Sequence, residues 1–589
     1  MFFKRGLLPL FAFQCPDNLY SATAEAILRQ FLVWLSEANS DNKVMFTSLM
    51  QHHPLMISSI IEFAERWYPD VEIVSRTTEG PIHRYSYREM GVRCRQMAAA
   101  LGKLGIAKGD RVGTLAWNGY RHLELYYSVS GSGAVLHTVN PRLFAEQMEY
   151  VINHAADRII FTDLTFVPIL ENLADKLDKV EHIVVMTDSD HMPDTKLDNI
   201  HCYEDLINAE SGDYQWPEFD ENAASSICYT SGTTGNPKGV VYSHRSTLIH
   251  AMGSSVPNGL GLSGADSILL VVPQFHVNAW GVSYAGPMNG CKLVLPGPAM
   301  DGKSIHELLD QEKCTLSLAV PTIWMMLTGY LKESGATLPF MKRVVIGGSA
   351  VPEAMIRSFE QEYDVQVIHA WGMTETSPLG TLNFLLPHLQ ELDYETQMET
   401  KLKQGKTVFG IDLRIVDDEN NTLPHDGIVF GKLQARGHWV TSGYYGEESS
   451  VGPDGWFDTG DVATIDKDGY MMITDRTKDV IKSGGEWISS IELENIAVGH
   501  ASVVEAAVIA IAHPKWDERP LLVAVTQSND EANGKPDKEE LLDYIGQRVA
   551  KWQVPDDVQF VDELPHGATG KLNKLKLREI FKDYKFPGT

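Results

Sequence analysis

Helical and extended patterns alternate along most of the chain, from about residue 56 to residue 470. Residues 87–104 and 122–130 have apolar positions at helical spacing, and Gly105 directly follows the first of these segments, which predicts two helices. Short apolar runs have the composition of buried strands. These runs are residues 111–116, 157–162, 183–186, 267–272, 292–295 and 342–346. The alternation predicts an α/β protein with layered subdomains.

The pattern changes twice in the C-terminal part of the chain. Turn-rich stretches at 417–421, 453–455 and 466–469 predict a β-rich subdomain of hairpins. After Arg476, helical patterns at 488–498 and 538–549 and strand patterns at 504–511 and 521–526 predict a small α+β domain, followed by a lysine-rich tail. We therefore predict an N-terminal extension at 1–44, a large domain at 45–477 and a small domain at 478–589.

Composition narrows the class of protein. The 589 residues are 43% hydrophobic and 22% charged, as in ordinary globular proteins. The formal net charge of −28 argues against nucleic acid or an anionic membrane surface as a partner. Six scattered cysteines without a CxxC pair fit a reducing cytoplasm better than a disulfide framework or a zinc site. No apolar run approaches the roughly 18 residues of a membrane span.

One loop carries the most specific chemical signal, Tyr229-Thr-Ser-Gly-Thr-Thr-Gly-Asn-Pro-Lys-Gly239. It lies between a predicted strand at 223–228 and an extended run at 240–242. Its glycines allow backbone N–H groups to point toward one centre, and its hydroxyls and Lys238 add donors, which predicts polyphosphate binding. It is not a Walker A loop, because Lys238 is followed by Gly239 and a β-like run.

A second motif, His369-Ala-Trp-Gly-Met-Thr-Glu-Thr-Ser-Pro378, follows a predicted strand at 365–368. Trp371 offers an aromatic platform for a base, and Glu375 offers a carboxylate for Mg²⁺. Taken alone, the motif also fits a buried strand followed by a helix cap.

Four more segments have candidate chemistry. Gly455-Trp-Phe-Asp-Thr-Gly-Asp461 predicts an acid in a tight turn, suited to ribose hydroxyls, and Asp475-Arg-Thr-Lys-Asp-Val-Ile-Lys482 is rich in cations. Pro565-His-Gly-Ala-Thr-Gly-Lys571 ends in a lysine after a turn, and Pro273-Gln-Phe-His-Val-Asn-Ala-Trp280 is apolar and aromatic. Gly259-Leu-Gly-Leu-Ser-Gly264 matches GxGxxG, but a loop precedes it and a strand follows, so we interpret it as a loop.

In their order and spacing, these motifs resemble the adenylate-forming superfamily, which contains acyl-CoA synthetases, luciferases and peptide-synthetase adenylation domains. The resemblance covers residues 45–584. It implies that Lys571 is the catalytic lysine of adenylation, that Thr230 and Glu375 are the Mg²⁺ positions and catalytic residues, and that Lys478 is the hinge of a mobile small domain. The nucleotide positions that it implies are Ser231, Gly232, Thr233, Thr234, Gly235, Lys238, Gly348, Ser349, His369, Ala370, Trp371, Gly372, Met373, Thr374, Asp461, Arg476 and Lys482.

Within the superfamily the chain is most similar to bacterial medium- and long-chain fatty acyl-CoA synthetases. The similar segments are Phe275-His-Val-Asn-Ala-Trp280, His137-Thr-Val-Asn-Pro-Arg142, Ile152-Asn-His-Ala-Ala-Asp157 and Lys482-Ser-Gly-Gly-Glu-Trp-Ile-Ser-Ser490. The similarity implies an acyl pocket at His276, Val277 and Trp280, with Trp280 as a gate that opens when ATP binds. It also implies CoA contacts at Gly484, Gly485 and Trp487.

The resemblance implies a fatty acid–CoA ligase that uses ATP, Mg²⁺ and CoA, without a prosthetic group, and that forms AMP and pyrophosphate. It also implies a homodimer and allows transient membrane contact. Two positions depart from the wider superfamily: Trp371 replaces the usual tyrosine, and Asp517 stands where many members have glycine.

Several alternatives stay open at this point. A sister branch with similar motifs activates methylmercaptopropionate, and luciferase chemistry begins with the same adenylate. A peptide-synthetase domain would be followed by a Leu-Gly-Gly-Xaa-Ser attachment motif, which this sequence does not contain. An inactive acyl-binding regulator would be expected to lack Lys571, Glu375 or the loop hydroxyls, and all are present. A plain ATPase would release ADP instead of AMP.

Overall fold

The structure is a computed structural model that describes residues 48–230, 236–484, 486–526, 537–566 and 572–587. The chain forms two compact units, Met1–His53 and Pro54–Thr589, and the helices and strands below belong to the second. Residues 231–235 of the predicted phosphate loop, Gly485 and Lys571 lie outside the described residues.

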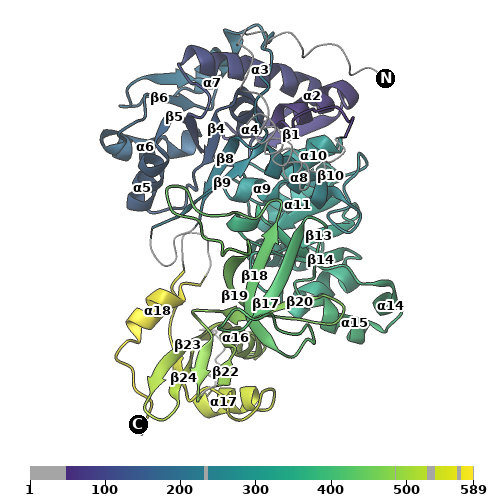
Figure 1. Cartoon of the computed structure of the whole chain (residues 1–589), viewed down its shortest axis with the longest axis vertical. Coiled ribbons are helices and arrows are strands. Elements are labelled where there is room, and N and C mark those ends of the chain that lie inside the picture. The colour runs from purple at the N-terminus through teal and green to yellow at the C-terminus, as the bar shows by residue number, and fades with distance from the viewer. Residues whose placement is uncertain (1–47, 231–235, 485, 527–536, 567–571, 588–589) are drawn as a thin grey trace, which may run out of the picture. The chain divides into compact units, whose positions relative to one another are not determined.

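The first large sheet has seven strands (Figure 1). Their order across the sheet is β7 (Ile200–Cys202), β6 (His182–Val185), β5 (Asp157–Thr162), β3 (Arg111–Leu115), β4 (Val135–Thr138), β8 (Ala224–Tyr229) and β9 (Gly239–Ser243). All neighbours pair in parallel except β8 and β9, which form an antiparallel hairpin around the predicted phosphate loop. The loop therefore starts at the carboxyl end of β8, the strand beside the edge strand β9, and the carboxyl ends of the strands are where α/β sheets usually bind ligands.

The second large sheet has nine strands. Their order is β16 (Lys406–Thr407), β15 (Leu379–Leu382), β14 (Gln366–Gly372), β13 (Arg343–Ile346), β12 (Leu316–Ala319), β10 (Ser267–Leu269), β11 (Lys292–Leu295), β1 (Glu72–Arg76) and β2 (Ile82–Ser86). The strands from β14 to β1 are parallel, and the edges are antiparallel. The strand predicted at 365–368 continues to Gly372, so it includes the first part of the second motif.

Helices cover both faces of both sheets, as the layered prediction requires. The core that contacts both sheets contains α2 (Ile57–Trp67), α3 (Tyr87–Lys103), α4 (Tyr120–Ser132), α8 (His244–Ser255) and α10 (Val282–Met288). The outer helices are α5 (Ala145–Ala155) and α6 (Val167–Leu173) on the first sheet, and α11 (Gly302–Gln311), α12 (Pro321–Ser334) and α13 (Glu353–Arg357) on the second. In β5, Ile159 and Phe161 face the middle helices and Ile160 faces the outer ones, because side chains alternate along a strand.

The predicted β-rich subdomain is a four-stranded antiparallel sheet of β17 (Ile411–Val416), β18 (Phe430–Gly437), β19 (Phe457–Ile465) and β20 (Met471–Arg476). Two short helices, α14 (Pro387–Gln390) and α15 (Tyr394–Lys401), precede it. The prediction of a tight turn at Asp461 is wrong. Asp461 lies within β19, directly opposite Arg476 in β20, and the glycine that suggested a turn, Gly460, adopts a φ of 71° inside the strand.

The small domain, yellow-green in Figure 1, contains a five-stranded sheet. Its elements are β21 (Ile481–Ser483), β22 (Glu486–Ile488), α16 (Ser490–Val498), β23 (Val503–His513), β24 (Asp517–Thr526), α17 (Lys538–Gly546), β25 (Asp557–Phe560) and α18 (Lys574–Ile580). The predicted lysine-rich tail contains α18. The helix predicted from residue 488 begins at Ser490, because the Ser489 hydroxyl accepts a bond from the Glu492 N–H. Asp517 has a φ of 62°, which explains why glycine suits that position.

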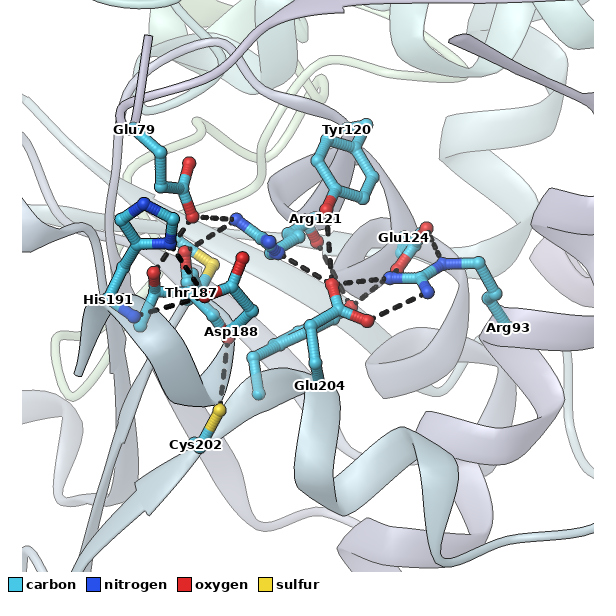
Figure 2. Close-up of polar contacts among 12 residues, drawn as sticks. Glu79, Arg93, Tyr120, Arg121, Glu124, Thr187, Asp188, His191, Cys202 and Glu204 are labelled. Atoms are coloured by element: carbon cyan, nitrogen blue, oxygen red, sulfur yellow. Dashed lines mark hydrogen bonds and ion pairs between the residues drawn. The ribbon is translucent and has the colours of Figure 1, made fainter. Parts of the chain in front are cut away.

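A buried ion network joins the turn after β1 to three helices of the first layers (Figure 2). Arg121 in α4 pairs with Glu79 at 2.7 Å and with Glu204 in α7 (Tyr203–Asn208) at 2.8 Å. Arg93 in α3 bridges Glu204 at 2.9 Å and Glu124 at 2.7 Å. Burial alone would raise the pKa of Glu204, but the hydrogen bonds and charges of the two arginines lower it to about 2.

Two further observations concern the described residues as a whole. The five cysteines among them are buried free thiols. None of the described helices has both the length and the apolar character that crossing a membrane requires.

Candidate active site

The two ends of the predicted phosphate loop are held together. The Thr230 N–H donates to the Lys238 carbonyl at 2.9 Å, and the Lys238 N–H donates to Thr230 Oγ1 at 3.1 Å. The carbonyl of Gly239 accepts a 2.8 Å bond from the Tyr445 N–H. The hairpin of β8 and β9 thus fixes both flanks of the loop, while 231–235 lie outside the described residues.

Glu375 is joined to this loop through Tyr444. Glu375 lies in a 3-10 helix, Thr374–Thr376, directly after β14 and Met373. The Tyr444 hydroxyl donates to Glu375 Oε1 at 2.7 Å, and the Tyr444 ring centroid lies 4.6 Å from Lys238 Nζ. The carbonyl of Thr374 accepts a 2.7 Å bond from the Tyr242 hydroxyl in β9. Tyr444 was not among the predicted site residues, and the local sequence Gly443-Tyr-Tyr-Gly446 predicts only a turn.

The donors at this position fit a magnesium ion. Burial raises the pKa of Glu375, and the Tyr444 hydrogen bond opposes that rise. A cation beside the carboxylate would favour its ionised form. Carboxylate and hydroxyl oxygens, here Glu375 and Thr230, are the ligands that Mg²⁺ takes. No cluster of three or more His, Cys, Asp or Glu that could hold a metal occurs among the described residues. Mg²⁺ is usually held by one or two carboxylates together with water and substrate phosphates.

Trp371, Asp461 and Arg476 form a second group. The Trp371 indole Nε1–H donates to Asp461 Oδ2 at 2.9 Å, and Arg476 Nε pairs with Asp461 Oδ1 at 2.8 Å. A Cβ at Gly380 would lie 2.2 Å from the Trp371 ring, so only glycine leaves room for the indole. The structure therefore brings the predicted base platform and the predicted ribose pair together, and their binding roles stay predictions.

Further predicted nucleotide positions lie near or in two paired strands, β13 and β14. Gly348 and Ser349 are exposed directly after β13, and Gly348 has a φ of 84°. In β14, Ala370 and Gly372 are half-buried. His369 is buried in the core, and burial lowers its pKa to about 4, so it is neutral near pH 7.

The predicted hinge and CoA residues lie at the start of the small domain. Lys478 connects β20 to β21. The N–H of Lys482 donates to Glu518 at 2.8 Å, and the N–H of Gly484 donates to the Trp516 carbonyl at 2.8 Å. Trp487 lies in β22.

The predicted acyl residues lie close to the nucleotide positions. His276 and Thr230 line the same small cavity of about 10 Å³, together with His137 and Tyr229. The Trp280 ring lies 3.3 Å from where a Cβ of Gly347 would stand, beside Gly348.

Trp324 and the pair Met325 and Met326 lie in α12. Trp324 is fully buried and packs edge-to-face against Phe359 at 5.5 Å, so it belongs to the core. Met325 and Met326 are 59% and 45% exposed.

The fold and the grouping of these residues define an adenylate-forming enzyme. Residues 62–445 match the AMP-binding enzyme family, and residues 492–571 match the AMP-binding enzyme C-terminal domain. The chain belongs to this family.

Known relatives agree with this assignment. The chain is 50% identical to a 3-methylmercaptopropionyl-CoA ligase of Ruegeria lacuscaerulensis, over 91% of this chain and 98% of that protein. It is also 50% identical to a medium-chain-fatty-acid–CoA ligase of Ectopseudomonas oleovorans, over 91% of this chain and 97% of that protein. The crystal structure of ATP-bound MatB from Rhodopseudomonas palustris shares the fold, with a TM-score of 0.76, 24% identity and coverage of 90% of this chain and 100% of that one.

Proposed function

We propose that this protein is a fatty acid–CoA ligase. It adenylates a medium- or long-chain fatty acid with ATP and then transfers the acyl group to CoA, releasing AMP and pyrophosphate. The observation that carries the proposal is that predicted acyl residues lie beside predicted nucleotide residues. His276 lines the same cavity as Thr230, and the Trp280 ring lies close to Gly347, next to Gly348. A plain ATPase has no need of such an acyl site beside its phosphate loop.

In the first step, the substrate carboxylate attacks the α-phosphorus of ATP, and the bond to pyrophosphate breaks. No side chain has to act as nucleophile, because the carboxylate is already ionised at neutral pH. Negative charge builds on the α-phosphate oxygens, where Lys571 stabilises it. Loss of one such preorganised group typically costs about 10²–10³ in rate. Mg²⁺, when bound at Thr230 and Glu375, supplies further neutralisation of phosphate charge.

The other residues orient the nucleotide. Trp371 provides a flat surface for the base, and its hydrogen bond holds the Asp461 carboxylate toward the ribose hydroxyls. Arg476 holds the other oxygen of that carboxylate through its Nε, at 2.8 Å. Tyr444 orients Glu375, and its ring lies 4.6 Å from Lys238 Nζ, which also pairs with Glu447 at 3.0 Å.

In the second step, the CoA thiol attacks the acyl carbonyl carbon of the adenylate, the bond to AMP breaks, and the thiol proton is released. The two steps need different surroundings, so we propose that the small domain turns about Lys478 between them. Lys571 leaves the site, and the segment with Gly484, Gly485 and Trp487 takes its place beside CoA.

The similarity to a 3-methylmercaptopropionyl-CoA ligase, equal to that with the medium-chain ligase, supports a second candidate substrate. 3-Methylmercaptopropionate would undergo the same two steps in the same site.

The test is AMP release from ATP, Mg²⁺ and CoA with acetate, methylmercaptopropionate, octanoate, palmitate or benzoate. AMP formed with octanoate or palmitate supports the fatty acid assignment. A preference for methylmercaptopropionate keeps the mechanism and changes the substrate. ADP in place of AMP, or no nucleotide product with any acid, contradicts the proposal.

A further inference from the structure

The short helix α9 (Val277–Trp280) has an unusual backbone. Val277, Asn278, Ala279, Trp280 and Gly281 all have positive φ, at 47°, 50°, 53°, 52° and 77°. L-residues disfavour this left-handed region, and a β-branched residue such as Val277 does so most strongly. Glycine is required at 281, because a Cβ there would lie 2.5 Å from the His250 ring. The rest of this left-handed turn needs other contacts to hold it.

Asn278 supplies such contacts through its side-chain amide. It is 5% exposed, its Nδ2 donates to Ser226 Oγ at 2.8 Å, and its Oδ1 accepts from the Cys228 thiol at 3.3 Å. Ser226 and Cys228 are two residues apart in β8, so they lie on the same face of the strand. Asparagine also tolerates left-handed backbone better than most residues, which suits it to this place.

The turn connects two parts of the proposed site. Its anchor strand, β8, leads directly into Thr230 and the phosphate loop. At its other end, the Trp280 ring lies close to Gly347. A Cβ added at Gly347 would lie 3.3 Å from this ring and 2.9 Å from the Ala370 carbonyl. The place of Trp280 between these elements therefore depends on how the turn is held against β8.

We propose that Asn278 is a positioning residue for acyl selection. Its amide holds the left-handed turn against β8, and this contact sets where Trp280 stands and which acyl chains the site accepts. The inference rests on the proposed function, because it concerns the acid that the enzyme activates.

The main test compares Asn278→Gly with the wild-type protein. Glycine adopts left-handed backbone freely, so this variant removes the amide contacts and leaves the turn allowed. We expect kcat/KM to lose selectivity between the best two acids by about tenfold or more, while KM for ATP changes by less than about twofold. Ser226→Ala should shift selectivity in the same direction, and the double variant should show less than the sum of the two effects.

Ser225→Ala is the matched control. Ser225 is the neighbouring buried serine of β8. Its hydroxyl donates to the Tyr242 carbonyl at 3.0 Å, whereas the Asn278 amide bonds Ser226 and Cys228. If Asn278→Gly and Ser225→Ala lower kcat/KM for every acid by the same factor, Asn278 only supports the core and the inference fails.

Two measurements keep the inference separate from the proposed function. Because residue 278 is left-handed, Asn278→Gly should melt at a higher temperature than Asn278→Ala, the reverse of the usual order. In protein labelled with 5-fluorotryptophan, the resonance assigned by Trp280→Phe should shift in Asn278→Gly and stay in place in Ser225→Ala. An unshifted resonance overturns the inference even if the enzyme is active. A wild-type protein that releases no AMP with any acid overturns the proposed function, and the resonance still tests Asn278.

Discussion

The hydroxyl of Tyr444 lies 2.7 Å from Oε1 of Glu375, and the same ring lies 4.6 Å from Lys238 Nζ. One tyrosine thus joins the proposed metal ligand to Lys238 of the phosphate loop, from a turn that belongs to neither motif. An outer hydrogen bond of this kind fixes the orientation of a metal-binding carboxylate.

We therefore expect Tyr444→Phe to weaken the response to magnesium. The variant keeps the ring and removes only the hydroxyl. Loss of such an outer contact typically costs about 10- to 100-fold in metal affinity or activity. The measurement is pyrophosphate release as a function of Mg²⁺ concentration, with Tyr445→Phe as the control for the adjacent ring. Equal Mg²⁺ curves for the two variants would show that the Tyr444 hydroxyl has no role in holding Glu375.

The pair of Asp461 and Arg476 leads to a prediction about ATP binding. Asp461→Asn keeps the shape of the side chain but removes the charge that Arg476 faces. A buried, charge-assisted acceptor for ribose hydroxyls is lost, so we expect KM for ATP to rise by about tenfold. KM for the acid should stay nearly constant. Asp412→Asn, at an exposed position in β17, is the control, and a change in KM for the acid equal to that for ATP would contradict the assignment.

The ion network in Figure 2 leads to a prediction about stability. Glu204→Gln removes the carboxylate that Arg93 and Arg121 share. Arg93 keeps Glu124 and Arg121 keeps Glu79 as partners, so we expect a loss of unfolding free energy below the roughly 3–5 kcal/mol that a fully unpaired buried charge costs. The control is Glu181→Gln, because Glu181 is half-exposed in its pair with Arg158. Such exposed pairs contribute about 1 kcal/mol or less.

The pH dependence gives this prediction its sign. The pKa of Glu204 is about 2 in the folded protein, below its ordinary value of 4.5. The unfolded chain therefore binds the proton first, and the stabilisation is present above pH 4.5 and is lost as the pH falls toward 2. Urea unfolding at pH 7 and at pH 3 should show a smaller difference between wild type and Glu204→Gln at the lower pH. A difference that does not shrink would mean that the charge of Glu204 is not what stabilises the network.

The sequence alone predicted the strands with high fidelity where they are short and buried on both faces. β5 and β11 have the predicted bounds, because a continuous apolar run between polar turns has few other interpretations. Asp461 was misplaced in a turn, because a glycine inside a strand has the same local appearance as a glycine in a loop. The helix α18, in which Leu577 is buried, was not predicted, because its sequence is rich in lysine.

Long-range contacts limited the prediction of the site. The motifs made Glu375, Asp461 and Arg476 candidates, because each lies in a distinctive local pattern. The Tyr444 hydroxyl bonds Glu375, which lies 69 positions earlier in the chain, and a local sequence pattern cannot predict a contact over that separation. The left-handed turn at Asn278 was equally hidden, since its anchor in β8 is 50 and 52 positions earlier in the chain.

The last prediction concerns domain alternation, which assigns separate half-reactions to two lysines. Lys571 lies outside the described residues, three positions before Lys574, whose Nζ pairs with Glu494 at 2.6 Å at the start of α18. We expect Lys571→Ala to abolish acyl-adenylate formation by removing a cation from the α-phosphate, and to spare thioester formation from supplied acyl-adenylate. Lys478→Pro should do the reverse, because proline fixes φ where the hinge must change its backbone angles.

The two half-reactions are measured separately, as pyrophosphate release without CoA and as acyl-CoA formation from supplied adenylate. Lys576→Ala, which removes an exposed lysine of α18, controls for general loss of charge. If Lys571→Ala and Lys478→Pro lost the same half-reaction, one arrangement of the domains would serve both steps. Opposite losses would mean that each step depends on a different segment of the small domain. The small domain would then have to present a different face to the site in each step.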